Sequence, residues 1–216
     1  MDQVLVPPSA RFGRPLPTSV LTCSPEEELK VLSLDVTGLR SAMAIGELSS
    51  ALITSVYIRR GRILGEKLNS VTEEMAESAM MAAEAADARW AAYRDGEGKV
   101  RQLEGIPISI KDCFICAGTC ATVGLENRVG IIDAEDGLFV KVLRDFGGAI
   151  PIFKTNVPPM MMSIESDNNV FGPTSNPHNL SRCVGGSSGG EGASLAANCA
   201  PLGFGTDIGG SIRVQQ

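Results

Sequence analysis

Apolar and polar positions recur at helical spacing through the first half of the chain. The stretch SPEE at 24–27 has the order of a helix start, with an N-cap, a proline and then acidic residues in the first turn. Three further segments carry the same spacing and are expected to be helices: about 35–45, from Ser49-Ser50 through Ile63, and from the capping-box pair Ser70 and Glu73 to about Arg94.

After Gly105 the pattern changes from helical to strand-like. Short continuous apolar runs at 106–110 and 149–154 predict two buried strands, with a helix near 136–145 between them. The remainder is rich in glycine and asparagine, and one helix is expected there at 193–198. Helices followed by strand, helix and strand favour an α/β layered sandwich.

Composition narrows the class of protein. The chain has 216 residues, of which 44% are hydrophobic and 20% charged, as in a globular domain or a large part of one. Its net charge of −6 argues against a nucleic-acid partner. No apolar run is long enough to span a membrane, and the start of the chain lacks a secretory signal pattern. We therefore expect the six cysteines to be reduced thiols in a cytoplasmic protein.

Glycine-flanked serines occur twice near the end of the chain, in GGSSGG at 185–190 and in GGS at 209–211. The first matches the G-x-S-x-G pattern of a hydrolase elbow around Ser188, but that elbow needs a preceding strand and a later histidine. His178, the single histidine, lies upstream in an Asn-Pro-His-Asn stretch, so a turn is its expected role and the Ser-His-Asp order fails.

A serine nucleophile without histidine needs another base, and a lysine can serve when burial disfavours its ammonium form. Lys111 directly follows the apolar run at 106–110. The other interpretation of Lys111 is a strand-end side chain that reaches out to water, and its position alone favours that one.

Five motifs occur in order along the chain: GIPISIKDCF, GAIPIFKTNVP, SDNNVFGPTSNPHN, GGSSGGEGA and PLGFGTDIGGSIR. Together, over about residues 28–213, they resemble the amidase signature family of serine hydrolases, and most of all its acetamidase and fatty-acid amide hydrolase-like branch. The resemblance implies an α/β layered sandwich in which helices flank a central mixed sheet. The Pro-rich start of the chain is expected to form an extended N-terminal arm over 1–24, and the resemblance makes 25–216 a partial amidase domain.

The resemblance also implies a Ser–cis-Ser–Lys triad. Lys111 would be the base, Ser187 the bridging serine after a cis peptide from Gly186, and Ser211 the nucleophile. The implied oxyanion donors are the backbone N–H groups of Ile208, Gly209, Gly210 and Ser211. Ser188 is expected to support the relay, and Asp207 and Arg213 to brace the nucleophile loop.

Through this triad the family hydrolyses carboxylic amides by way of an acyl-enzyme, so a small-molecule amide is the expected substrate, and no metal or organic cofactor is implied. The C-x-x-C pair Cys113 and Cys116 lacks the further ligand or fold that a metal or redox site needs. Glu165, Asp167 and Glu191 are interpreted as loop scaffolding rather than as a carboxylate pair.

The chain departs from the family at its end, because Arg213 is followed by only three residues where members continue. The resemblance therefore predicts a C-terminally truncated domain that lacks part of the sheet and has little or no activity. Two alternatives stay open: the glutaminase-like subunit of an amidotransferase, and a non-catalytic amidase fragment that binds a partner. The sequence also leaves the oligomeric state open, a homodimer included.

Overall fold

A four-stranded mixed sheet forms the centre of the computed structural model, which describes residues 6, 11–12, 15–20 and 22–215. The strands are β1 (Val71–Glu74), β2 (Pro107–Lys111), β3 (Ile150–Thr155) and β4 (Gly203–Phe204). Their order is β1-β3-β2-β4. β1 is antiparallel to β3, whereas β2 runs parallel to both β3 and β4. The α/β class with a mixed sheet is therefore confirmed.

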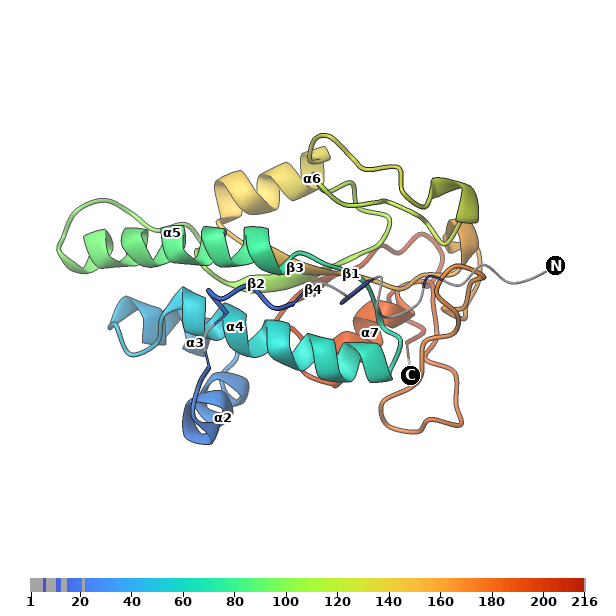
Figure 1. The fold of residues 1–216 in the computed structure, drawn as a ribbon, viewed down its shortest axis with the longest axis horizontal. Helices are drawn as coiled ribbons and strands as arrows, with labels where there is room; N and C mark the ends of the chain where they lie inside the picture. Colours follow the sequence, from blue (N-terminus) through green and yellow to red (C-terminus); the bar gives the residue numbers. More distant parts are fainter. Residues whose placement is uncertain (1–5, 7–10, 13–14, 21, 216) are drawn as a thin grey trace.

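Helices cover both faces of this sheet (Figure 1). The α-helices are α2 (Pro25–Ser33), α3 (Val36–Ala44), α4 (Ser50–Arg60), α5 (Ala76–Arg94), α6 (Leu138–Lys141) and α7 (Gly189–Ala196). Wider π turns, η1 (Gly61–Gly65) and η3 (Val142–Gly147), extend α4 and α6, and short 3₁₀ turns lie at η2 (Glu126–Arg128) and η4 (Pro159–Met161). In Figure 1, α5 and α6 lie on one side of the strands, and α4 and α7 lie on the other.

Three of the expected helix starts are confirmed at their caps. Ser24 accepts a hydrogen bond from the Glu27 N–H, and the Glu27 carboxylate accepts one from the Ser24 N–H, which completes a capping box. Asp35 and Ser49 cap α3 and α4 in the same way with single side-chain bonds. These starts were predictable because a cap depends on residues within one turn.

The expectation that Ser70 and Glu73 open one long helix is wrong. Val71–Glu74 is instead strand β1, and its pairing with β3 satisfies backbone groups that a helix would have bonded internally. Glu73 accepts a hydrogen bond from the Cys120 N–H rather than capping a helix, and α5 begins only at Ala76. The last helix also begins earlier than expected, at Gly189 rather than near 193.

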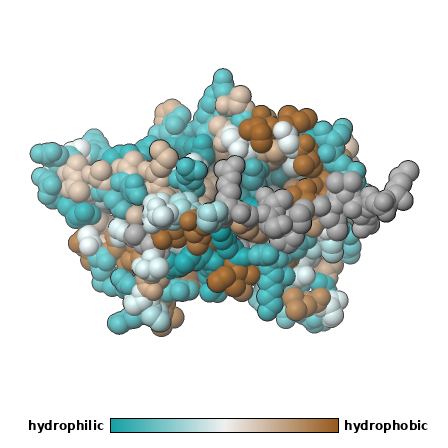
Figure 2. Space-filling model, viewed as in Figure 1, coloured by the Kyte–Doolittle hydropathy of each residue, from teal (hydrophilic) through white to brown (hydrophobic). Residues whose placement is uncertain are grey.

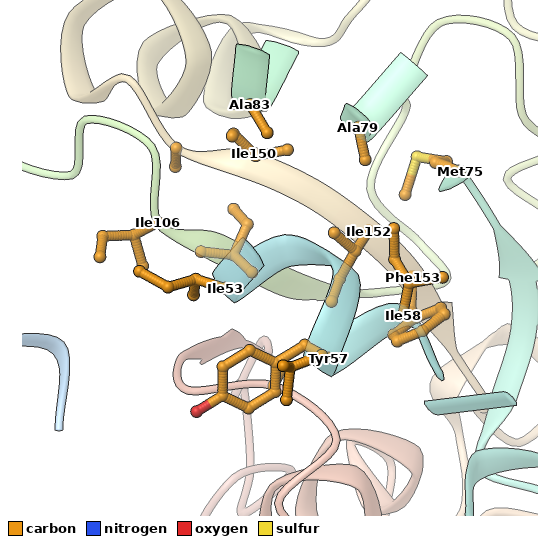
Figure 3. Close-up of a cluster of buried hydrophobic side chains, with 14 of the residues drawn as sticks. Ile53, Tyr57, Ile58, Met75, Ala79, Ala83, Ile106, Ile150, Ile152 and Phe153 are labelled. Atoms are coloured by element: carbon orange, nitrogen blue, oxygen red, sulfur yellow. The ribbon is translucent and has the colours of Figure 1, made fainter. Parts of the chain in front are cut away.

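The main core lies between the sheet and helices α4 and α5 (Figure 3). Ile53 and Tyr57 of α4, Ala79 and Ala83 of α5, and Ile152 of β3 are all almost fully buried there. Close packing explains one glycine: a Cβ at Gly61 would overlap the Phe153 ring. This core anchors β2 and β3, which end at the polar residues Lys111 and Thr155.

Within the predicted arm, Phe12, Leu16 and Val20 are partly buried against this core, while residues 1–5 and several others of the arm lie outside the described residues. The surface in Figure 2 is mixed, with apolar residues in small groups among polar ones. No helix in the described part of the chain is long and apolar enough to cross a membrane.

Candidate active site

Lys111 is the last residue of β2, and its side chain is completely buried. Its Nζ lies 2.7 Å from the Ser187 Oγ and 2.9 Å from the Thr206 Oγ1. Burial lowers the pKa of Lys111, and the neighbouring Cys113, Glu191 and Asp207 only partly oppose that shift. The amine is therefore buried and in contact with a serine, unlike a strand-end lysine that reaches out to water.

Ser187 lies in a tight turn directly after Gly185 and Gly186. The Gly186–Ser187 peptide is cis, and Gly185 has a φ of +82°, where a side chain would also overlap the Val214 carbonyl oxygen. The Ser166 hydroxyl closes the turn: it donates to the Gly185 carbonyl at 3.1 Å and accepts from the Gly189 N–H at 2.9 Å. The turn aims the Ser187 hydroxyl at Lys111 and starts α7 two residues later.

Ser188 joins this turn to the segment that carries the second glycine-flanked serine. Its N–H donates to the Ser211 carbonyl at 3.0 Å, and its Oγ donates to the Thr206 carbonyl at 3.2 Å. Ser211 is half-buried, and its hydroxyl makes no hydrogen bond to any other described residue. The structure thus brings Lys111 and Ser187 into contact and ties the Ser211 backbone to the residue after Ser187, without a bond between the Ser187 and Ser211 hydroxyls.

Asp207 organises the turn around Ser211. Its carboxylate accepts from the Gly210 N–H at 2.7 Å and the Ile212 N–H at 3.0 Å, and the Arg213 guanidinium donates to both carboxylate oxygens at 2.9 and 3.0 Å. The Arg213 hydrogen bonds hold the pKa of Asp207 well below its usual range. Asp207 and Arg213 therefore brace the turn.

The four backbone N–H groups expected at an oxyanion site do not share one environment. The Gly210 N–H donates to Asp207, whereas no bond from the N–H groups of Ile208, Gly209 and Ser211 is seen to another described residue. Ile208 is fully exposed. Within the described part of the chain, three of the four N–H groups are thus free to bind an acceptor, and the fourth has to exchange partners first.

Thr206 was not assigned a role from the sequence, and Glu191 was interpreted as loop scaffolding although it lies in helix α7. Thr206 holds Lys111 through its side chain and lies in the TDIGGS motif, so that motif could have pointed to it. Glu191 was grouped with Glu165 and Asp167, but those two are exposed and Glu191 is buried. Its carboxylate accepts from the Ser109 Oγ at 2.6 Å and the Thr155 Oγ1 at 2.8 Å, and burial raises its pKa to about 7.

The other candidates lie apart from this chemistry. His178 is exposed, and its N–H donates to the Asn176 side chain at 2.9 Å, as expected of a turn residue. All six cysteines are free thiols. Among the described residues, no group of three or more His, Cys, Asp or Glu side chains is arranged to hold a metal ion.

A buried lysine in hydrogen-bond contact with a serine is also the arrangement that Ser–Lys hydrolases use. The family model described as Amidase matches residues 52–214, and the chain belongs to this amidase family.

Two relatives show the extent of the similarity. The chain is 39% identical to fatty-acid amide hydrolase 1 of Sus scrofa over 183 residues, which cover 85% of the chain and 29% of that protein. It is 36% identical to an acetamidase of Aspergillus oryzae over 187 residues, or 87% and 34% of the two chains. A solved structure of a fatty acid amide hydrolase superposes with a TM-score of 0.80 at 32% identity, covering 89% of this chain and 33% of that one. The chain thus spans about a third of the length of these relatives.

Proposed function

We propose that this chain carries the catalytic groups of an amidase, which hydrolyses the carbon–nitrogen bond of small carboxylic amides through an acyl-enzyme. Ser211 is the nucleophile, Ser187 the bridging serine and Lys111 the base. The observation that carries the proposal is the 2.7 Å contact between the Lys111 Nζ and the Ser187 Oγ, buried at the end of β2. Membership of the amidase family and the names of the relatives support the choice of substrate class.

In the proposed acylation step the Ser211 Oγ attacks the amide carbonyl carbon. Ser211 passes its proton to the Ser187 Oγ as Ser187 passes its own to the neutral amine of Lys111. The carbonyl π electrons move onto oxygen and form a tetrahedral oxyanion. When the oxyanion collapses, the carbon–nitrogen bond breaks, and the leaving nitrogen takes a proton back from Lys111 through Ser187.

Deacylation follows the same route with water as the nucleophile. Water attacks the Ser211 ester, its proton travels through Ser187 to Lys111, and the same proton returns to Ser211 as the acid is released. No metal or organic group takes part in these steps. The amine has to be neutral before each attack and charged after it. Burial suits it to this role because burial favours the neutral form.

The proposed oxyanion donors are the backbone N–H groups of residues 208–211. In other serine hydrolases the loss of one such donor costs about 3 kcal/mol of transition-state stabilisation. Here the Gly210 N–H has to leave the Asp207 carboxylate before it can bind the oxyanion. The proposal therefore assigns the first contacts to the N–H groups of Ile208, Gly209 and Ser211.

The exposure of this turn bears on the activity of residues 1–216 alone. Ile208 is fully exposed and Ser211 is only half-buried, so water competes with the backbone donors for the oxyanion. We therefore propose that the isolated 216-residue polypeptide turns over simple amides slowly or not at all. Clean turnover by the purified polypeptide, abolished by Ser211→Ala, would contradict this part of the proposal.

Covalent labelling with a fluorophosphonate probe tests the triad without the need for full turnover. We expect the label on Ser211, none in Ser211→Ala, and a labelling rate at least about 100-fold lower in Lys111→Met. Ser181→Ala, a change at an exposed loop serine, is the matched control and should label like the wild type. Labelling that persists in Ser211→Ala, or that maps to another serine, would refute the assignment. Preferential hydrolysis of glutamine would instead favour the amidotransferase alternative, and a folded chain that never labels would favour the binding fragment.

A further inference from the structure

Glu191 is a buried acid at the site that the proposed mechanism does not use. It lies in the first turn of α7 and is only 4% exposed, with its carboxylate held between the hydroxyls of Ser109 and Thr155 at 2.6 and 2.8 Å. A Cβ at Gly203 of β4 would overlap its Oε2, so the strand backbone closes the remaining side. The carboxyl is therefore fixed among β2, β3 and β4.

The polar contacts of Glu191 are with neutral groups. Lys154 of β3 is the residue before Thr155, and its Nζ donates to the Cys120 carbonyl. Arg60 contacts the other end of α7, where its Nε donates to the Ala197 carbonyl. Neither cation takes part in a hydrogen bond or ion pair with Glu191 in the described structure. The cation that acts on this carboxyl is Lys111, whose charge favours the ionised form of Glu191.

Strand register places Lys111 and Glu191 on the same side of the sheet. Ser109 and Lys111 are two residues apart on β2, so their side chains leave the same face. Thr155 is the register partner of Lys111 on β3. Both hydroxyls that hold the carboxylate are thus immediate neighbours of the Lys111 side chain.

Two other groups, Cys113 and Asp207, also act on the charge of Lys111, but each is less suited than Glu191 to balance it. The Cys113 thiol is half-buried, and burial raises its pKa, so it is neutral near pH 7. The Asp207 carboxylate already forms a two-point ion pair with Arg213. The contacts of the Lys111 Nζ itself are with the neutral oxygens of Ser187 and Thr206.

We propose that Glu191 is the counter-charge of the proton relay: its carboxylate stabilises the ammonium that Lys111 becomes when it receives the proton. The inference rests on the proposed function, which makes Lys111 the base. Glu191 touches neither the substrate nor Ser211 and acts through Lys111, as a positioning residue. Its two hydroxyl partners can donate to a carboxylate or accept from a carboxylic acid, so the cluster tolerates either protonation state.

Titration of the two groups by nuclear magnetic resonance tests the coupling directly. The chain has six lysines, so the Cε signal of Lys111 can be assigned in ¹³C-lysine protein by its loss in Lys111→Met. Glu191→Gln keeps the shape and both hydrogen bonds but removes the charge. We expect it to lower the titration midpoint of Lys111 by about one pH unit. Glu84→Gln, which removes an exposed charge from α5, is the matched control and should leave that midpoint unchanged.

The reciprocal experiment keeps the test decisive if one variant does not fold. In Lys111→Met the carboxyl of Glu191, followed by its Cδ signal, should titrate at a pH higher by the same amount, because a coupling between two sites is mutual. Two results would overturn the proposal. One is a Lys111 midpoint in Glu191→Gln that rises, or that falls by less than about 0.2 pH unit, which is far below the expected coupling of about one unit. The other is a Glu191 midpoint that does not rise in Lys111→Met.

The pH profile of fluorophosphonate labelling links this coupling to the relay. In Glu191→Gln the acid limb of the rate should move to lower pH by about one unit, because the neutral amine then persists to lower pH. A merely structural role would lower the rate at every pH without moving the limb, and that result would also overturn the proposal. Reciprocal shifts in a chain that is never labelled would instead contradict the proposed function and leave the charge coupling standing.

Discussion

Replacement of Gly190 by alanine tests how closely α7 packs against the sheet, because a clash with the sheet and the higher helix propensity of alanine change stability in opposite directions. Gly190 lies in the first turn of α7 and is packed against the backbone of Asn156, which follows β3. A Cβ there would lie 2.5 Å from the Asn156 carbonyl oxygen and closer still to its nitrogen. The Gly190 N–H also donates to that carbonyl at 3.1 Å. The methyl group can be accepted only if α7 moves away from the sheet.

The expected cost follows from three contributions. Overpacking against a backbone costs about 1–3 kcal/mol, and loss of the hydrogen bond to Asn156 costs about 1 kcal/mol. Alanine recovers at most about 1 kcal/mol from its higher helix propensity. The net loss in free energy of unfolding is about 2 kcal/mol, which lowers Tm by about 4–8 °C in a chain of this length.

Urea unfolding of Gly190→Ala and Gly192→Ala, analysed at equal m-values, measures this difference. Gly192 is the matched control, because it lies in the same helix and its added Cβ would meet only the flexible side chain of Gln215. Gly192→Ala should be neutral or stabilising by up to about 1 kcal/mol. If both variants unfold at the same midpoint, the close approach of α7 to Asn156 does not exist and the reasoning fails.

Two further predictions concern stability and thiol reactivity. Glu104 is buried; burial acts to raise the pKa of its carboxyl, but hydrogen bonds from Arg101 and Arg89 hold it below its usual value. Glu104→Gln should therefore lower the free energy of unfolding by about 2 kcal/mol near pH 7, which is less than for a fully buried pair because both arginines are partly exposed. The difference in urea midpoint between the variant and the wild type should shrink as pH falls below about 4, where the carboxylate becomes protonated. A difference that stays constant with pH would count against the pairing. Burial raises the pKa of Cys116 and of Cys199 to about 11 each. After iodoacetamide treatment at about pH 8, mass spectrometry should therefore find the exposed Cys183 modified in the native protein, and Cys116 and Cys199 modified only after unfolding. Equal rates of modification of the three thiols in the native protein would show that this burial is wrong.

The elements that the sequence predicted well are those whose causes are local. The caps at Ser24, Asp35 and Ser49 each need only the next few residues. The apolar runs at β2 and β3 are buried on both faces, so their composition alone marks them as strands.

The elements that were missed depend on distant partners. Val71–Glu74 has a helix-start pattern, but it pairs with β3 some 80 residues later in the sequence. Gly189 and Gly190 belong to a helix that their propensity opposes, because only glycine fits against Ser166 and Asn156. The two residues of β4 carry no periodic pattern at all.

The candidate site divides in the same way. Motif resemblance placed Lys111 and Ser187 in one site, and the structure brings them within 2.7 Å. It did not reveal that Glu191 is buried beside them, because that follows from the hydroxyls of Ser109 and Thr155 on two different strands. Residue type alone could not distinguish this acid from an exposed one such as Glu165.

The two halves of the proposed site are organised over very different distances along the chain. Asp207 shapes the Ser211 turn through residues three to six positions away, so this turn can take its form almost as soon as its own residues exist. Lys111 meets Ser187 across 76 positions and Thr206 across 95. During synthesis Lys111 therefore leaves the ribosome long before its hydrogen-bond partners, and β2 can complete its contacts only after β3, α7 and β4 have emerged. Lys111 therefore gains these contacts only after Ser187 and Thr206 have been synthesised.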